Sequence, residues 1–525
     1  MFVTFSVAIL ALVLSASWVH PAFLWTLVVI GPVIILGICD MIQTKHAIRR
    51  NFPVVGHGRY LLESIRPEIN QYFVESNTDG RPFSREDRSV VYQRAKGQMD
   101  TLPFGTQKDV YGSGYEWINH SLAPAHVLKE HQRIIVGGKD CTQPYEASIF
   151  NVSAMSYGSL SKNAILALNT GAKMGGFAHN TGEGGLSPYH LKPGGDIIWQ
   201  IGTGYFGCRN PDGTFNIDLF TKRATLPNVK MIEIKLSQGA KPGHGGILPA
   251  AKVTQEIVEI RGVEMGKDVI SPPAHSAFST PIGLLEYVAT LRRASGGKPV
   301  GFKLCLGKRR EFLAIVKAML ESKILPDFIT VDGAEGGTGA APLEFSDSVG
   351  TPLNDGLVFI HNALVGAGIR DQIRIIAAGK VNTGFHLASK IALGADMCNA
   401  ARGMLFAIGC IQALRCNTNA CPTGVATQDP ELVKGLHVGN KAQRVANFHH
   451  ETVKSFFEVL GAAGLKSPRE LKPWHIMRRI SPTEVRNYSE IYPYIEPESL
   501  LKSSPPEEFA RPWAAARSDS FETFF

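Results

Sequence analysis

Three cysteines lie within one short segment of this 525-residue chain, at Cys410, Cys416 and Cys421, and Pro422 follows the last of them. Thiolates at such spacing before a proline are typical of iron–sulfur binding. Four-iron clusters normally take four cysteines, so a triad favours a three-iron cluster or a fourth ligand other than Cys. Zinc is the competing metal, but the segment contains neither His nor a Cys-x2-Cys pair. Three buried core thiols are the remaining alternative.

Polar, glycine-rich stretches between residues 154 and 403 are a second source of chemistry. Each follows a short apolar run: 154–159, 180–185, 235–243, 271–273, 332–339, 378–380 and 400–403. Glycines let the backbone approach a ligand closely, and N–H groups after the last strands of a parallel barrel are the usual phosphate cradle. One such loop is weak support, whereas several at consecutive strand ends predict a ligand site.

Eight apolar runs alternate with longer amphipathic stretches, which is typical of parallel βα units. The expected strands are Ser148–Val152, Gly176–His179, Met231–Ile234, Val269–Ser271, Val300–Leu304, Phe328–Val331, Ile373–Ala377 and Met397–Asn399. Eight units of this size predict a (β/α)8 TIM barrel, in which chemistry lies at the C-terminal strand ends. An open doubly wound sheet is the alternative; the missing Gly-x-Gly-x-x-Gly turn argues against its dinucleotide-binding version.

The first forty residues contain two uncharged apolar runs, Phe2–Trp18 and Ala22–Cys39, separated by a His-Pro break. Each run approaches the roughly 20 residues that span a bilayer as a helix. Lys45 and Arg49 follow, so the positive-inside rule keeps the rest of the chain in the cytoplasm. The sequence therefore predicts a membrane helical hairpin. A cleaved signal peptide is the alternative, but a basic start is missing and a second apolar run is present.

Composition and charge limit the remaining possibilities. The net charge of +8 is scattered, which argues against nucleic-acid binding, and eight cysteines without a regular pattern do not indicate a disulfide scaffold. The expected organisation is a transmembrane hairpin (1–45), a connecting or cap region (46–130), the barrel with the cysteine segment (131–440) and a C-terminal helical extension (441–525).

Residues 154 to about 428 resemble the FMN-binding synthase domain of glutamate synthase. The matching strings are Met155–Ser159, Asn180–Gly185, Gln238–Gly243, Asp332–Gly339 and the cysteine segment through Gln428. The resemblance implies a TIM barrel that holds FMN beside a 3Fe-4S cluster on the three cysteines. It also implies reductive amination of 2-oxoglutarate with ammonia, by hydride transfer from the flavin to the imine.

Two further features of that family are not found in this sequence. The chain does not begin with a catalytic Cys of an amidotransferase domain, and no NADPH-binding motif is recognised. We therefore expect a stand-alone, membrane-tethered synthase barrel. Free ammonia would be the nitrogen source, and ferredoxin or a separate reductase would supply electrons.

The resemblance also assigns roles to individual residues. Lys235 would lie near the pyrimidine edge of the flavin, where a cation stabilises the reduced ring, and Lys241 and Arg261 would bind the carboxylates of the oxo acid. The expected cofactor contacts are Met155, Ser156, Gln238, Lys303, Asp332, Gly337, Gly379, Lys380, Ala401 and Arg402.

Three positions depart from the family pattern. Asn163 and His244 stand where Glu is usual, and Ile247 replaces a Gln of the oxo-acid site. Because Ile247 removes a hydrogen-bonding side chain, a different oxo acid or imine is an alternative substrate. A membrane-bound flavin and iron–sulfur electron-transfer protein is a further alternative, although Lys241 and Arg261 favour substrate chemistry.

Overall fold

The computed structural model describes residues 1–98, 101–126 and 133–522. The expected boundary between connecting region and barrel, at 130–131, lies outside these residues. The chain divides into two compact units, Met1–Arg85 and Glu86–Phe525.

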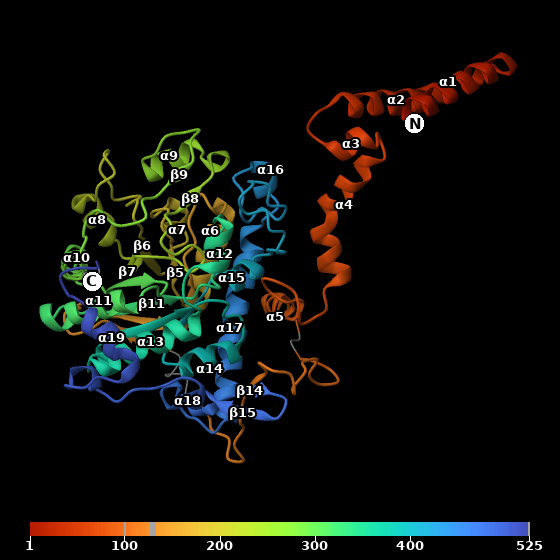
Figure 1. Cartoon of the computed structure of the whole chain (residues 1–525). Coiled ribbons are helices and arrows are strands. Elements are labelled where there is room, and N and C mark those ends of the chain that lie inside the picture. The colour runs from red at the N-terminus through yellow and green to blue at the C-terminus, as the bar shows by residue number, and fades with distance from the viewer. Residues whose placement is uncertain (99–100, 127–132, 523–525) are drawn as a thin grey trace. The chain divides into compact units, whose positions relative to one another are not determined.

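Eight parallel strands of the larger unit close into a barrel (Figure 1), which confirms the predicted TIM barrel. Around the barrel the strands are β4 (Phe150–Val152), β5 (His179–Asn180), β6 (Ile197–Ile201), β7 (Val229–Lys235), β10 (Val300–Leu304), β11 (Phe328–Asp332), β12 (Arg374–Ala378) and β13 (Met397–Ala400). The barrel closes where Cys398 pairs with Phe150. Nearly all strand residues are buried, because a parallel barrel is covered on its outer face by helices.

The covering helices carry an apolar face toward the strands. They are α6 (Lys162–Gly175), α8 (Ile217–Ala224), α10 (Pro281–Ala294), α11 (Arg309–Ser322), α13 (Leu353–Gly366), α14 (Gly384–Ala392) and α17 (Val438–Ala462). The connections also contain the short helices α7 (Pro188–Leu191), α12 (Leu343–Ser348), α15 (Arg402–Ala407) and α16 (Pro430–Val433). Helix α6 begins where the Ser161 hydroxyl accepts the Ala164 N–H and ends at Gly176 in the left-handed conformation. Gly171 lets α17 approach closely, since a Cβ there would lie 2.6 Å from the Ala442 carbonyl oxygen.

One expected strand was wrong and one strand was missed. Val269–Ile270 (β9) pairs antiparallel with Ile247–Leu248 (β8), outside the barrel, beside the short helix α9 (Gln255–Arg261). The missing barrel strand is β6, whose five residues are all buried. A short apolar run does not reveal its pairing partner, and Gln200 makes the β6 run look less apolar than its burial requires.

The barrel interior contains a buried carboxylate, Glu233, that explains why the polar side chain of Gln200 can be buried. Glu233 on β7 accepts hydrogen bonds from Asn180 (2.7 Å), Gln200 (2.6 Å) and the Thr330 hydroxyl (2.7 Å). These bonds join β5, β6, β7 and β11 through one side chain. A satisfied polar network of this kind fixes the relative positions of the strands.

The segments before and after the barrel complete the larger unit. β1 (Glu116–Ile118), β14 (Ile476–Ser481) and β15 (Glu484–Asn487) form one sheet, and β2 (Arg133–Val136) pairs with β3 (Tyr145–Ser148). The region expected to be a helical extension thus contains strands as well as α17, α18 (Tyr488–Ile491) and α19 (Glu507–Ala515). Figure 1 shows α9 and β8–β9 at one end of the barrel and β14, β15 and α19 toward the other.

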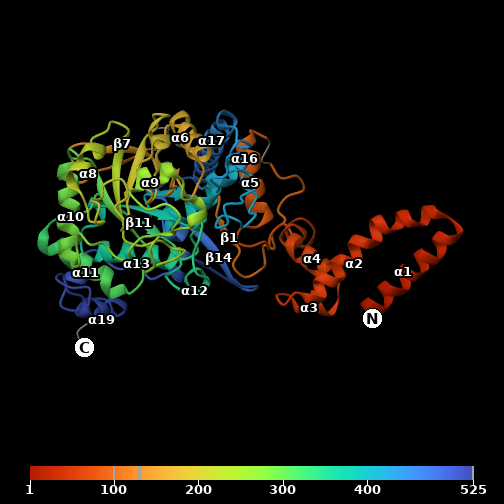
Figure 2. The same cartoon turned by 90° about the horizontal axis from the view of Figure 1, so that it is seen from above.

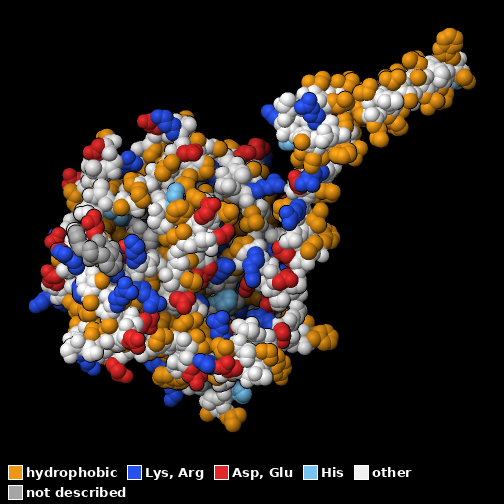
Figure 3. Space-filling view, viewed as in Figure 1, with side chains coloured by type: hydrophobic (Ala, Val, Ile, Leu, Met, Phe, Trp, Pro, Cys, Tyr) orange, Lys and Arg blue, Asp and Glu red, His pale blue; other side chains and the backbone are white. Residues whose placement is uncertain are grey.

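The smaller unit begins with two apolar helices, α1 (Phe2–Val19) and α2 (Leu27–Ile42), joined by the 3-10 turn η1 (Pro21–Thr26). They run antiparallel (Figure 2), and the Phe2 ring packs on Gly37. Figure 3 shows hydrophobic side chains over most of this hairpin. Within the described part of the chain, Phe2–Val19 and Pro21–Ile42 are long and apolar enough to cross a membrane.

Candidate functional site

Glu183 lies among three cationic side chains at the C-terminal ends of the strands. Its carboxylate is 2.9 Å from the Lys235 ammonium, and Lys241 and Arg261 act on it electrostatically. Burial alone would raise the pKa of Glu183, but the three cations hold it below its usual value. One ionised carboxylate therefore faces three positive charges, which leaves two of them uncompensated within this group.

Lys241 and Arg261 are buried cations. Burial lowers the pKa of Lys241 to about 8 and that of Arg261 to about 10, each against the opposing attraction of Glu183. Lys241 donates to the Ala340 carbonyl at 3.0 Å, and Arg261 donates to the Tyr157 carbonyl at 2.7 Å. Buried charges with few anionic partners are costly unless a ligand compensates them.

Two glycines make room for the Arg261 guanidinium. A Cβ at Gly184 would lie 2.6 Å from its Nη2 atom, and one at Gly158 would lie 2.9 Å away. The guanidinium stacks 5.2 Å from the Phe206 ring centre, and its buried Nε has no hydrogen-bond partner among the described residues. The glycine-rich loops after β4 and β5 are thus shaped around this cation, with one donor spare.

Lys303 and Asp332 form a buried ion pair of 3.1 Å at the ends of β10 and β11. Burial opposes the charge of Lys303, but Asp332 and Glu233 together raise its pKa. Asp332 also accepts the Gly239 N–H at 3.0 Å. Gly239 has no space for a side chain, because a Cβ there would lie 1.8 Å from the Gly333 carbonyl oxygen.

Hydrogen bonds connect Lys235 with two of the expected cofactor contacts, Gln238 and Gly337, and a third, Arg402, bonds the residue after Gly337. Gln238 accepts from Lys235 (3.2 Å) and donates to the Gly337 carbonyl (3.1 Å). Arg402 donates to the Thr338 carbonyl at 2.6 Å, and a Cβ on Gly337 would collide with its guanidinium. The loops after β7, β11 and β13 are therefore held together at one end of the barrel.

The other expected contacts lie at the same strand ends. The carbonyl of the buried Met155 accepts a hydrogen bond from a His190 ring nitrogen at 3.0 Å, and Ser156 packs against Gly182. Lys380 after β12 has a left-handed backbone, with φ of 49°, and Ala401 is the N-cap of α15. The structure places all these residues on the loops that the sequence predicted; their contacts with a cofactor stay a prediction.

The three cysteines lie on one irregular loop after α15. Burial raises the pKa of Cys410 to about 11, and the charges of Cys416 and Cys421 add to this shift. Burial would also raise the pKa of Cys421, but hydrogen bonds from Thr423, Val425 and Ala426 lower it. Cys410 accepts the Gln412 N–H at 3.5 Å. N–H donors to sulfur are suited to thiolates that hold a cluster.

A buried lysine faces the same thiols. Burial lowers the pKa of Lys252 to about 8, against the attraction of Cys416 and Cys421, and its ammonium donates to the Ser159 carbonyl at 2.9 Å. In the described ranges, no three His, Cys, Asp or Glu side chains converge closely enough to hold a metal ion. The donor set fits an iron–sulfur cluster by its chemistry, while the thiols are not gathered at metal-binding distance.

The cysteine loop is fastened to the loop after β4. Gln428 donates to the Gly158 and Leu160 carbonyls at 3.0 and 2.9 Å, and the Ser161 hydroxyl donates to the Gly424 carbonyl at 2.6 Å. These bonds join the cysteine segment to the loop that also supplies Met155 and Ser156. The two sequence motifs therefore form one neighbourhood.

The three positions that depart from the family pattern, Asn163, His244 and Ile247, each contact a neighbouring segment of the barrel unit. Asn163 donates to the Val433 and Leu436 carbonyls, so its amide supports the segment after the cysteine loop. Ile247 lies in β8, paired with Ile270. His244 bonds the Gly245 carbonyl and packs edge-on against Phe345.

Glu183 and His275 are among the residues of this neighbourhood that were not assigned a role from the sequence. Glu183 stood inside a glycine-rich string, and its one signal was that it is the only acidic residue of Asn180–Gly185. His275 bonds the Lys235 carbonyl at 2.9 Å and the Tyr205 hydroxyl at 3.1 Å, and burial lowers its pKa to about 4. A neutral His275 thus supports the end of β7. The expected strand Val269–Ser271 ended before His275, and no sequence pattern indicated the contact with the distant Lys235 carbonyl.

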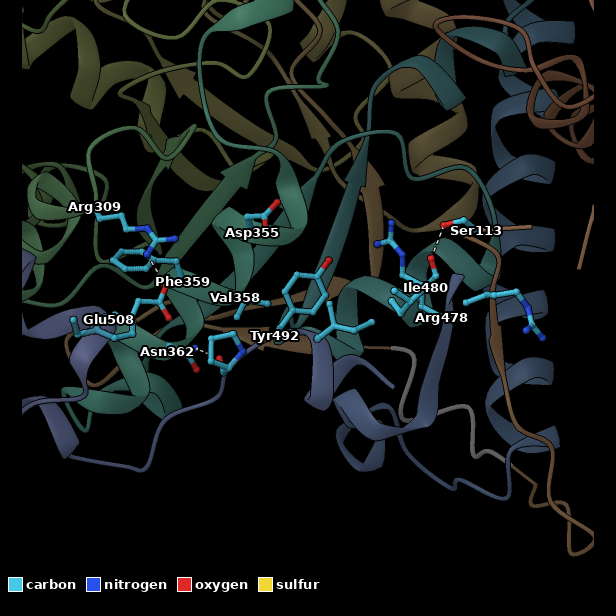
Figure 4. A pocket seen from close by; sticks show the side chains of 14 residues that line it. Ser113, Arg309, Asp355, Val358, Phe359, Asn362, Arg478, Ile480, Tyr492 and Glu508 are labelled. Atoms are coloured by element: carbon cyan, nitrogen blue, oxygen red, sulfur yellow. Dashed lines mark hydrogen bonds and ion pairs between the residues drawn. The ribbon is translucent and has the colours of Figure 1, made fainter. Parts of the chain in front are cut away.

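A cavity of about 590 Å³ lies away from the strand ends, between the outer face of α13 and the C-terminal segments (Figure 4). Its charged side chains are largely satisfied: Arg309 pairs with Glu508, and Arg479 donates to the Val110 carbonyl. A second cavity, of about 670 Å³, is lined by Arg370, Asp396 and Trp474. Neither contains Glu183, Lys241 or Arg261.

Comparison with known proteins identifies the family. Residues 123–466 match the family described as the conserved region in glutamate synthase. The glutamate synthase large subunit-like protein YerD of Bacillus subtilis is 40% identical over 84% of this chain and 91% of its own length. The archaeal glutamate synthase (NADPH) of Methanocaldococcus jannaschii is 38% identical, but the match covers 61% of this chain and 60% of that protein.

Solved structures with a similar fold are more distant. A flavocytochrome b2 variant with bound pyruvate superposes with a TM-score of 0.41 at 12% identity, covering 74% of this chain and 82% of that one. A mandelate oxidase variant with an FMN adduct gives 0.40 at 14% identity, covering 81% and 98%. These values describe a loose likeness of fold. The family match and the relatives of 38–40% identity place this chain in the glutamate synthase family.

Proposed function

We propose that the barrel is an FMN- and iron–sulfur-dependent oxidoreductase that reductively aminates 2-oxoglutarate, or a related 2-oxo acid, with ammonia. The observation that carries this proposal is the group of Lys235, Lys241 and Arg261 around Glu183, with two uncompensated positive charges. A dicarboxylic oxo acid is a dianion and would balance them. Membership in the glutamate synthase family supports the same substrate class.

Within this proposal Lys241 and Arg261 hold the substrate. Arg261 has a spare, buried Nε donor, and a guanidinium can bind a carboxylate through two parallel hydrogen bonds. Lys241 would act as a point charge for the second carboxylate. Glu183 pairs with Lys235 and leaves Lys241 and Arg261 available to bind the substrate, so its role is to position Lys235.

FMN would be held by the strand-end loops. Gly239 and Gly337 leave no room for side chains of their own and present backbone to a neighbouring group. Lys235 and Gln238 would meet the flavin ring, while Gly379, Lys380 and the Ala401–Arg402 backbone would meet the phosphate. Bound reduced FMN would supply the hydride that converts the imine of the oxo acid to an amino acid.

The three cysteines would hold a 3Fe-4S cluster. Three thiols, N–H donors to two of them and the buried Lys252 suit an anionic cluster. Gln428 and Ser161 tie this loop to the loop of Met155, which supports a short route for electrons between cluster and flavin. The electrons would come from ferredoxin or a separate reductase.

The hairpin α1–α2 would anchor the protein in a membrane, with the barrel on the cytoplasmic side. Its length, its apolar surface and the basic residues that follow it support this placement.

A related 2-oxo acid remains an alternative substrate within the proposal, because Ile247 offers no hydrogen bond at a position where the family usually has Gln.

Anaerobic re-oxidation tests the proposal. The purified chain is reduced chemically, and the flavin absorbance is followed after addition of 2-oxoglutarate, oxaloacetate or pyruvate, each with and without ammonium. Re-oxidation that needs both a dicarboxylic oxo acid and ammonium is expected. A protein without flavin, or a reduced flavin that no oxo acid re-oxidises, would contradict it.

A further inference from the structure

An exposed apolar stripe runs along α4 (Gly56–Ile69) and the following π-turn η2 (Asn70–Val74). Its members are Leu61, Leu62, Ile65, Ile69 and Phe73. At the helical period these positions share one face, and all are exposed, Leu62 at 61% and Phe73 at 84%. An apolar surface of this kind on a folded protein marks an interaction site.

The opposite face of α4 is polar, and the surroundings are basic. Arg59 pairs with Glu63 at 2.9 Å, and Ser64 lies on the side away from Phe73. Residues 41–74 contain five Lys or Arg and two Glu. A basic amphipathic helix with exposed Leu, Ile and Phe is the type of helix that lies in a membrane interface.

The end of α2 fixes where α4 begins. Asp40, in the last turn of α2, is buried and accepts the Val54 N–H at 2.9 Å and a His57 ring nitrogen at 2.8 Å. Arg49 stacks on the Tyr60 ring at 4.5 Å. The first turn of α4 is thus held at the level where the apolar helix ends, which is the level of the bilayer surface if α2 crosses the bilayer.

The direction of α4 suits the same surface. Figures 1 and 2 agree that α4 runs across the direction of α1 and α2. A helix that crosses a membrane-spanning helix lies near the membrane plane. In Figure 3 hydrophobic side chains line the edge of α4 on the side toward which the hairpin extends.

From this geometry we infer that α4 and η2 form a second membrane contact, an interfacial helix that inserts the stripe of Leu61, Leu62, Ile65, Ile69 and Phe73 into the surface of an anionic bilayer. This inference rests on the proposed membrane anchor, because the hairpin brings α4 to the surface. The basic surroundings favour anionic lipid over a neutral surface.

Site-specific photocrosslinking in the full chain tests the inference. Benzoylphenylalanine replaces Leu62, Phe73 or, as the matched control on the polar face, Ser64, in vesicles with and without anionic lipid. Several times more lipid adduct is expected from 62 and 73 than from 64, and Ile65→Glu should reduce the adduct at 73. Crosslinks from 62 and 73 into the barrel or a second copy, or equal lipid labelling at all three positions, would overturn it.

Carbonate extraction of the same samples separates the two claims. A chain that stays in the vesicles while positions 62 and 73 crosslink to protein retains the hairpin anchor and refutes the interfacial helix. A chain that carbonate releases from the vesicles refutes the hairpin anchor, and with it the interfacial helix that depends on it.

Discussion

Arg261 is held by its backbone contact with Tyr157 and by the space that Gly158 and Gly184 leave. Its replacement by Ala should therefore remove one charge-assisted contact with the oxo acid, of roughly 1.5–3 kcal/mol. We expect the KM for the oxo acid to rise about tenfold or more. Arg261→Lys retains the charge but not the planar guanidinium, so its KM should lie between those of the unaltered protein and Arg261→Ala. Equal KM values for all three proteins would contradict a carboxylate contact.

Lys241 should give substrate binding a pH dependence. Its pKa is lowered to about 8, so the ammonium that attracts the substrate is present below that pH and is lost above it. We expect the dissociation constant of a dianionic oxo acid, measured by flavin perturbation, to rise as the pH increases beyond about 8. Because Arg retains its charge, Lys241→Arg should move this rise to higher pH.

Replacing Glu183 should also shift the pH at which substrate binding is lost, in the direction opposite to the shift expected for Lys241→Arg. Its negative charge raises the pKa of Lys241, so Glu183→Gln should lower that pKa and shift the loss of binding to lower pH. Lys235 would also lose its 2.9 Å ion pair. An unchanged pH profile in this variant would show that Glu183 and Lys241 are not coupled.

The loops were easier to predict than the strands that carry them. Strings such as Asn180–Gly185 contain polar and glycine residues in fixed order, and the structure places them at strand ends. By contrast Ile197–Ile201 contains a Gln whose burial depends on Glu233, a residue distant in sequence. Val269–Ile270 carried the same apolar signal but pairs with β8. Pairing partners are non-local, and a single sequence does not contain them.

Contacts between side chains of the site are likewise non-local, and their partners could not be predicted from the sequence. The sequence indicated Lys235, Lys241 and Arg261 as cations of the site, and the structure couples all three to Glu183. The carboxylate itself was hidden in a glycine-rich string. The role of Asn163 as a donor to the Val433 and Leu436 carbonyls could not be foreseen either, because those carbonyls lie far along the chain.

The cysteine loop makes a prediction about composition. Purified anaerobically, the chain should contain about three iron atoms and show the EPR signal of an oxidised three-iron cluster. Cys416→Ser should lose most of the iron while retaining flavin. Cys141→Ser, outside this loop, is the matched control and should keep both. One zinc per chain without iron would refute the cluster.

The division into two compact units makes a prediction for the whole molecule. The full chain should fractionate with membranes and resist high salt, because the apolar surface of α1 and α2 does not depend on charge. A chain that starts at residue 86 keeps the larger unit and should be soluble with its flavin. Membrane association of that shorter chain, or release of the full chain by salt, would contradict the anchor.

The most direct test of the central claim is a single anaerobic turnover with labelled ammonia. The reduced protein is mixed with 2-oxoglutarate and ¹⁵N-ammonium, and the products are measured by mass spectrometry while flavin oxidation is recorded. The proposed function predicts one ¹⁵N-glutamate for each flavin oxidised, with the yield strongly reduced in Arg261→Ala. Flavin that remains reduced, or is oxidised without any ¹⁵N-labelled amino acid, would contradict it.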